Sequence, residues 1–188
     1  MGEPSIHIHE DDVGMRSMHP AAAFAEVAAD VAESVDAGER NRAPSGVGWT
    51  AVHMIAEPKI SYANLGLQLA DVADPLAPIF PRIRKFKATM TSGFRADSDD
   101  PLGSYNDDAW CFGVDRRCFI KLDTDGALVK QIWFECYQAD AESVDRLRQA
   151  IVAIDAIAES CIADYWLGIN GRVRDAVFLD TYISALAR

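Results

Sequence analysis

Two histidines and three carboxylates fall within six consecutive positions near the start of the sequence, in the stretch SIHIHEDD at residues 5–12. In an extended strand neighbouring side chains alternate between two faces, so His7 and His9 project to the same side. Imidazoles in that arrangement can chelate one divalent ion, with the adjacent acidic residues as oxygen ligands. His53 completes a set of three if the strands that carry these histidines pair. The stretch therefore indicates either a metal site on His7, His9 and His53 or a solvated strand face that enters an acidic turn.

We favour the solvated strand face, because short His-x-His patterns on exposed strands commonly arise without a ligand role. The His-x-His pattern of His7 and His9 resembles the first strand of metal-dependent amidohydrolases, but at these two positions only. Those barrel enzymes need further histidines late in the chain, and none follows His53 in this sequence. We therefore expect no cofactor and keep a divalent metal with hydrolase-like chemistry as the alternative.

A second concentration of acidic residues lies at 95–108, where RADSDDPLGSYNDD has the composition of a long loop. Loops of this length within a compact domain are uncommon and often functional. The spacing of the carboxylates does not match a calcium-binding loop, which needs a fixed glycine and a distal glutamate. We therefore expect the loop to bind a partner through its carboxylates. These are Asp97, Asp99, Asp100, Asp107 and Asp108.

A third candidate surface lies on the apolar strand predicted at 128–137. Alternation places Trp133 and Glu135 on one face of that strand, together with Gln131 and Tyr137. An aromatic ring beside a carboxylate can hold an arginine or lysine through stacking and charge together. We therefore add Trp133 and Glu135 to the predicted partner-binding residues.

Signatures of catalysis are missing from the sequence. It contains no Gly-x-Ser-x-Gly elbow, no P-loop and no dinucleotide-binding glycine pattern. The four cysteines form no Cys-x-x-Cys pair and lie in apolar segments, so we expect buried thiols. These absences favour a protein that binds over one that catalyses.

The net charge of −11 narrows the class of partner. An acidic surface repels phosphate backbones and attracts cationic surfaces, so we expect a basic protein partner and no nucleic acid. The opening residues do not form a secretory signal, and no apolar run approaches the ~18 residues of a membrane span. We expect a cytoplasmic protein with no membrane partner, and leave assembly into an oligomer of identical chains open.

The order of elements predicts an α+β domain over residues 1–188. Period-two patterns or apolar runs predict strands at 5–9, 49–55, 85–94, 110–114, 117–123 and 128–137. Period-3.6 patterns predict helices from His19-Pro20 to about residue 36, at 61–71, from 141 through Tyr165, and at 173–187. Asp123-Thr124-Asp125-Gly126 has the turn chemistry of a hairpin. We expect a single mixed, mainly antiparallel sheet of about five or six strands with helices packed on it.

The tail at 164–183, DYWLGINGRVRDAVFLDTYI, resembles the C-terminal segments of bacterial immunity-type proteins. The shared features are an Asp-aromatic-Trp run ending one helix at residues 164–166, a glycine turn at Gly171, and a short helix with Asp175, Phe178 and Tyr182. Immunity proteins are small acidic α+β proteins that neutralise a cognate toxin. The resemblance implies a non-enzymatic inhibitor that engages a basic partner through an acidic surface.

Overall fold

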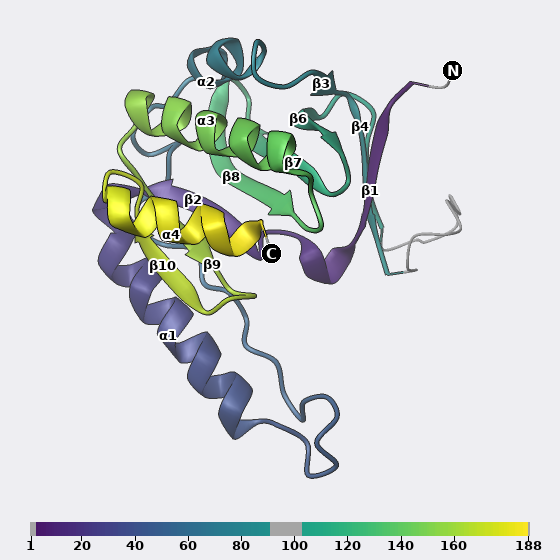
Figure 1. Cartoon of the computed structure of the whole chain (residues 1–188), viewed down its shortest axis with the longest axis vertical. Helices are drawn as coiled ribbons and strands as arrows, with labels where there is room; N and C mark the ends of the chain where they lie inside the picture. The colour runs from purple at the N-terminus through teal and green to yellow at the C-terminus, as the bar shows by residue number, and fades with distance from the viewer. Residues whose placement is uncertain (1–2, 91–102, 188) are drawn as a thin grey trace.

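The computed structural model describes residues 3–90 and 103–187, which form two β-sheets and four α-helices (Figure 1). The α+β class is therefore confirmed, whereas the single sheet of five or six strands is wrong. The strands are β1 Ser5–His9, β2 Arg16–Pro20, β3 Arg82–Ile83, β4 Lys85–Thr89, β5 Ser104–Asn106, β6 Trp110–Asp115, β7 Cys118–Asp125, β8 Leu128–Cys136, β9 Ser160–Asp164 and β10 Ile169–Arg172. The α-helices are α1 Phe24–Arg40, α2 Leu69–Leu76, α3 Ala141–Ile157 and α4 Ala176–Leu186.

The larger sheet has seven strands in the order β10-β9-β2-β8-β7-β6-β3, and every neighbouring pair is antiparallel. The hairpin between β7 and β8 turns at Gly126, whose φ of 59° confirms the predicted turn. β2 pairs with β8 at only two positions, Ser17 with Trp133 and Met18 with Ile132. The ladder between the two strands therefore ends at Trp133, and beyond it Arg16 of β2 meets Glu135 of β8 through its side chain.

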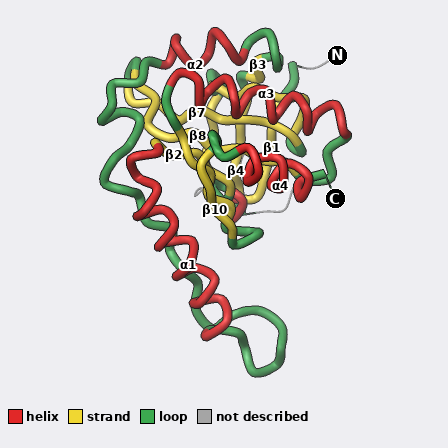
Figure 2. The backbone as a smooth tube through the Cα atoms, turned by 60° about the vertical axis from the view of Figure 1, so that its left-hand side comes forward, coloured by secondary structure: helices red, strands yellow, loops and turns green. Residues whose placement is uncertain are grey.

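One face of the large sheet carries α2, α3 and α4 (Figures 1 and 2). The main core fills the interface, where apolar side chains of α3 such as Leu147 and Ile151 meet Ile132 and Phe134 of β8. Asp140 caps α3 by accepting a hydrogen bond from the Ser143 N–H at 2.7 Å. This layer contains most of the buried apolar side chains and supports the sheet from behind.

The opposite face is covered by two separate units. One unit is a three-stranded sheet of β1, β4 and β5, in which β1 runs parallel to β4. Ile6 of β1 and Phe86 of β4 share a core with Phe119 and Trp133 of the large sheet. α1 packs through Val27 and a few neighbouring side chains against β9. The face is therefore divided into two covered halves.

Three predicted elements are wrong for identifiable reasons. Residues 16–20 form β2 rather than leading directly into a helix; all five are buried, so no alternation reveals the strand. Residues 49–55 form an exposed loop rather than a buried strand. The helix that begins at 141 ends at Ile157, and residues 160–164 form β9, because the fully buried SCIAD continues the apolar spacing of the helix.

Two further boundaries differ from the predictions. The helix expected over 61–71 is confined to α2, which begins at Leu69 and includes Pro75. The last helix begins at Ala176, where the Asp175 side chain accepts from the N–H groups of Val177 and Phe178. Within the described ranges, no helix is both long and apolar enough to cross a membrane.

Candidate functional site

The first candidate surface is an arm, residues 24–60, made of α1 and the loop that returns along it. The arm projects from the body of the molecule (Figures 1 and 2). Asp30 of α1 holds the returning strand of the loop, because its carboxylate lies 2.9 Å from His53 Nε2 and accepts from the Ala56 N–H at 3.3 Å. Asp30 also accepts from the Tyr165 hydroxyl at 2.6 Å, which ties the arm to the end of β9. The loop thus has a fixed course.

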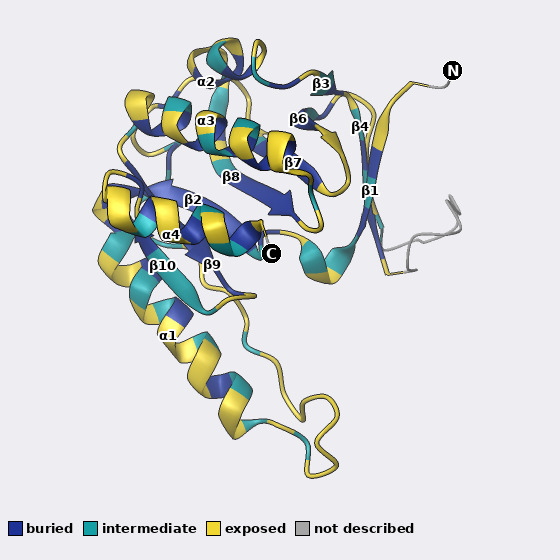
Figure 3. Cartoon of the chain, in the orientation of Figure 1, coloured by how far each residue is buried: buried dark blue, intermediate teal, exposed yellow. Residues whose placement is uncertain are grey.

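The fixed loop carries large apolar residues, and Figure 3 colours most of this loop as exposed. Val47 is 82% exposed, Trp49 62%, Val52 77% and Met54 79%. The tip is closed by backbone hydrogen bonds, including Thr50 N–H to the Asn41 carbonyl at 2.8 Å. Single exposed apolar residues are common, but four within eight positions make a patch of the kind that marks an interaction surface.

Charge on the arm is predominantly acidic. Residues 24–60 contain six carboxylates and three cationic side chains. Glu33 pairs with Arg40 at 2.6 Å, and Glu26 accepts from the Lys59 N–H at 3.1 Å. Asp36 and Glu39 are exposed and have no cationic partner among the described residues. The apolar patch therefore lies on an arm that carries unpaired carboxylates, together with two exposed cations, Arg42 and Lys59, that form no ion pair among the described residues.

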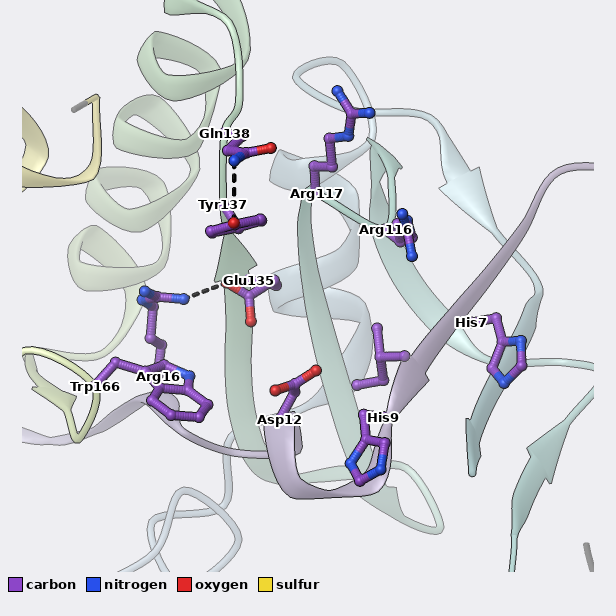
Figure 4. Close-up of a pocket in the computed structure, with 11 residues that line it drawn as sticks. His7, His9, Asp12, Arg16, Arg116, Arg117, Glu135, Tyr137, Gln138 and Trp166 are labelled. Carbon is purple, nitrogen blue, oxygen red and sulfur yellow. Dashed lines mark hydrogen bonds and ion pairs between the residues drawn. The ribbon is translucent and has the colours of Figure 1, made fainter. Parts of the chain in front are cut away.

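The second candidate site is a cavity of about 620 Å³ on the divided face of the large sheet, where the ladder between β2 and β8 ends (Figure 4). His7 and His9 of β1 form one side, and Trp166, in the turn between β9 and β10, lies on the other. The end of β8 contributes the back, and the turn between β6 and β7 lies above. Segments distant in the sequence therefore converge on this cavity.

A buried ion network forms part of the cavity wall. Arg16 donates from Nε to Asp164 at 2.9 Å and from Nη1 to Glu135. Asp164 is fully buried and also accepts from the Tyr182 hydroxyl at 3.0 Å. Burial raises the pKa of Glu135, against the opposing effect of Arg16. Because Arg16 faces two carboxylates, its charge is neutralised within the wall.

The turn between β6 and β7 brings two further arginines to the cavity. The Asp115 carboxylate accepts from the Arg117 N–H at 2.7 Å, and the Arg117 carbonyl accepts from the Tyr137 N–H at 2.8 Å. These bonds fix the turn, whereas the guanidinium groups of Arg116 and Arg117 pair with no carboxylate in the described part of the chain. Free positive charge therefore borders the cavity of an acidic protein.

The cavity also contains the histidines singled out in the sequence. His7 Nε2 lies 2.7 Å from Thr89 Oγ1, and the His9 ring accepts from the Asp11 N–H at 3.2 Å. His53 does not join them, because the strand predicted to carry it is the arm loop. In the described ranges, no three His, Cys, Asp or Glu side chains gather closely enough to hold a metal ion. The metal site proposed on all three histidines therefore lacks its third imidazole.

The predicted partner-binding residues are dispersed. Asp97, Asp99 and Asp100 lie outside the described residues. Asp107 is exposed, whereas Asp108 pairs with Arg82 at 2.8 Å and with Arg84 at 3.0 Å.

Trp133 and Glu135 do not offer an exposed surface to a partner. The small sheet covers Trp133, which is 1% exposed and donates to Asp123 at 2.8 Å, and Glu135 is 9% exposed against Arg16. The alternation correctly placed both on one face, but that face is covered.

The four thiols, Cys111, Cys118, Cys136 and Cys161, are buried and unbridged, as predicted. Burial raises the pKa of Cys161 to about 11, which keeps this thiol protonated and unreactive.

No protein-family model matches the chain, and no curated protein or solved structure is similar to it at a significant level. The function must therefore be inferred from the geometry of the chain itself.

Proposed function

We propose that this protein is a non-enzymatic binding protein whose arm, residues 24–60, engages a protein partner with a basic surface around an apolar patch. The observation that supports the proposal most directly is the exposure of Val47, Trp49, Val52 and Met54 on a loop held in a fixed course. A fixed loop loses little conformational freedom when it binds, which favours affinity.

Charge specifies the kind of partner. The exposed carboxylates of Asp36 and Glu39 lie on the same arm as the apolar residues and have no cation of their own among the described residues. A partner with lysine or arginine around an apolar anchor complements both features. The overall charge of −11 accelerates the approach of such a partner. An inhibitor of the immunity kind is the finer form of this proposal.

The test compares the partners captured from the native host by the wild-type chain and by two variants. Val52→Ser with Met54→Ser removes half of the patch without opening a core. Val177→Ser is the matched control, because Val177 is 78% exposed on α4, outside the arm. We expect the same basic protein to be retained by wild type and control, and to bind the arm variant at least about tenfold more weakly.

Asp36→Asn with Glu39→Gln should slow association and reduce its salt dependence, measured by surface plasmon resonance against the captured partner. An immunity-type inhibitor should also abolish the toxic activity of that partner. The proposal fails if no partner is captured, if the arm variant captures it equally well, or if binding is indifferent to salt. A dimer of this chain that the arm variant loses would replace the proposal with self-association.

A further inference from the structure

We infer that the cavity behind β1 binds a small organic molecule that carries a carboxylate or phosphate at one end and a flat body at the other. This site is separate from the arm and does not depend on the proposed function. The inference rests on the unpaired guanidinium groups of Arg116 and Arg117, the aromatic walls, and the position of Asp12.

The anionic end of the ligand belongs at the turn between β6 and β7. Arg116 and Arg117 are consecutive and exposed, lie in a turn held by the hydrogen bonds of the Arg117 N–H and carbonyl, and have no carboxylate partner in the described chain. Guanidinium groups bind carboxylate and phosphate through paired hydrogen bonds. Arg16 adds little attraction, because Glu135 and Asp164 already neutralise it. The anion is therefore assigned to the side of the cavity that Arg116 and Arg117 line, where the Arg117 guanidinium points away from Asp12 (Figure 4).

The local potential agrees with this assignment. The pKa of His7 is lowered by burial and by the charges of Lys87 and Arg116. Both effects disfavour a proton on His7, as expected where positive charge gathers around a group with restricted access to water. A bound anion supplies the missing negative charge, and it should raise the pKa of His7.

The body of the ligand should be flat. Trp166 is 50% exposed and Tyr137 61% exposed, and both lie on the side of the cavity opposite His7 (Figure 4). Their rings offer apolar faces for stacking. Gln138 donates from Nε2 to the Tyr137 hydroxyl at 3.0 Å and has a φ of 49°, a left-handed conformation that glutamine rarely adopts. Such conformations concentrate at binding sites, and this one lies next to Tyr137 in the cavity lining.

Asp12 limits the charge of the ligand. Its carboxylate points into the cavity on the side away from Arg117 and has no cationic partner in the described ranges (Figure 4). A second negative group on the ligand would approach Asp12 and be repelled. The cavity therefore selects molecules with negative charge at one end only.

The experiment measures binding of simple probes by ligand-observed NMR at concentrations up to about 10 mM. Benzoate and phenyl phosphate carry one anionic end on a flat ring, and the stronger of the two identifies the anion. Benzyl alcohol lacks the charge, inorganic phosphate lacks the ring, and terephthalate adds a second carboxylate. We expect benzoate or phenyl phosphate to bind best and terephthalate to bind at least about tenfold more weakly than benzoate.

The variants identify the residues responsible. Arg116→Gln with Arg117→Gln should weaken the best probe at least about tenfold. Arg146→Gln, an exposed arginine of α3, is the matched control and should have no effect. Asp12→Asn should bring terephthalate close to benzoate in affinity. In the wild type, the best probe should raise the pKa of His7, measured by NMR titration of its ring.

Three results would overturn the inference: no binding of benzoate or phenyl phosphate, equal binding to the double arginine variant, or equal binding of benzyl alcohol. The arm variant Val52→Ser with Met54→Ser should bind the probes normally. Failure of the arm and failure of the cavity are therefore distinguishable.

Discussion

Replacing Arg16 with methionine would test whether the buried ion network stabilises the cavity wall. Methionine keeps much of the apolar stem of arginine and removes its charge. Two buried carboxylates, Asp164 at 0% and Glu135 at 9% exposure, would then lose their cation. Removal of one partner from a buried pair costs about 3–5 kcal/mol, because the remaining charge stays in a medium that solvates it poorly. The total stability of a typical domain is about 5–15 kcal/mol, so the expected loss is large.

The assay is urea unfolding followed by fluorescence and far-UV circular dichroism at about pH 7. Arg146→Met is the control, because Arg146 pairs with Glu142 across one helical turn with side chains 40% and 74% exposed. An exposed pair of this type contributes about 0–1 kcal/mol. Adding Glu135→Gln to Arg16→Met should restore part of the lost stability, because neutral glutamine does not need the cation.

The pH dependence of the Arg16 variant provides a second readout. Burial raises the pKa of Glu135 and Arg16 opposes that rise, so removing Arg16 raises the pKa further. A carboxylate with a raised pKa in the folded state binds a proton more readily when folded than when unfolded. The penalty of Arg16→Met should therefore shrink as the pH falls towards about 5. A loss below about 1 kcal/mol at neutral pH, or a loss that does not change with pH, would refute the reasoning.

Two further predictions concern pH and backbone space. Burial lowers the pKa of His19 from 6.5 to about 4, so the unfolded chain binds a proton at His19 more readily than the folded chain does. The neutral His19 therefore carries no penalty above pH 6.5, and the free energy of unfolding falls as the pH drops from 6.5 towards 4. His19→Gln should remove about 3 kcal/mol of that acid sensitivity, measured as unfolding free energy against pH. Gly113→Ala should cost about 1–3 kcal/mol, because the new Cβ would lie 2.5 Å from a carbonyl oxygen of β7. Gly38→Ala in α1, with its nearest neighbour 3.9 Å away, should instead stabilise the fold by up to about 1 kcal/mol, and thermal unfolding would distinguish the two.

Elements with one buried face could be predicted from the sequence. Ile6 and Ile8 are buried while His7 and His9 are partly exposed, so the alternation of β1 was visible in the residues. The sequence also correctly predicted the hairpin at Gly126 and the start of α3 at Ala141. These elements have a polar face, and periodicity detects that contrast.

Elements buried on every side could not be identified in this way. β2 contains Arg16 and His19, yet both are buried, because one is paired with carboxylates and the other is neutral beside Ser17. β9 is buried throughout and continues the apolar spacing of α3. The opposite error occurred at 49–55, where apolar residues predicted burial and the loop is exposed. The polarity of a residue predicts its burial only when polar residues face solvent and apolar residues face the core. A polar residue with a buried ion partner breaks this rule, and so does an apolar residue on a binding surface.

The same distinction applies to charge. Composition correctly counts 29 carboxylates against 18 cations, but it does not show which charges remain available. Asp108 is paired with two arginines and Asp30 holds the arm loop in place, so neither is free to meet a partner. Asp36 and Glu39 remain unpaired in the described chain, as do the guanidinium groups of the turn between β6 and β7. Recognition depends on this unpaired subset, which leaves unpaired carboxylates on the arm and two unpaired arginines, opposite the Asp12 carboxylate, at the cavity. An acidic protein can therefore attract a cationic partner at one site and an anionic ligand at another.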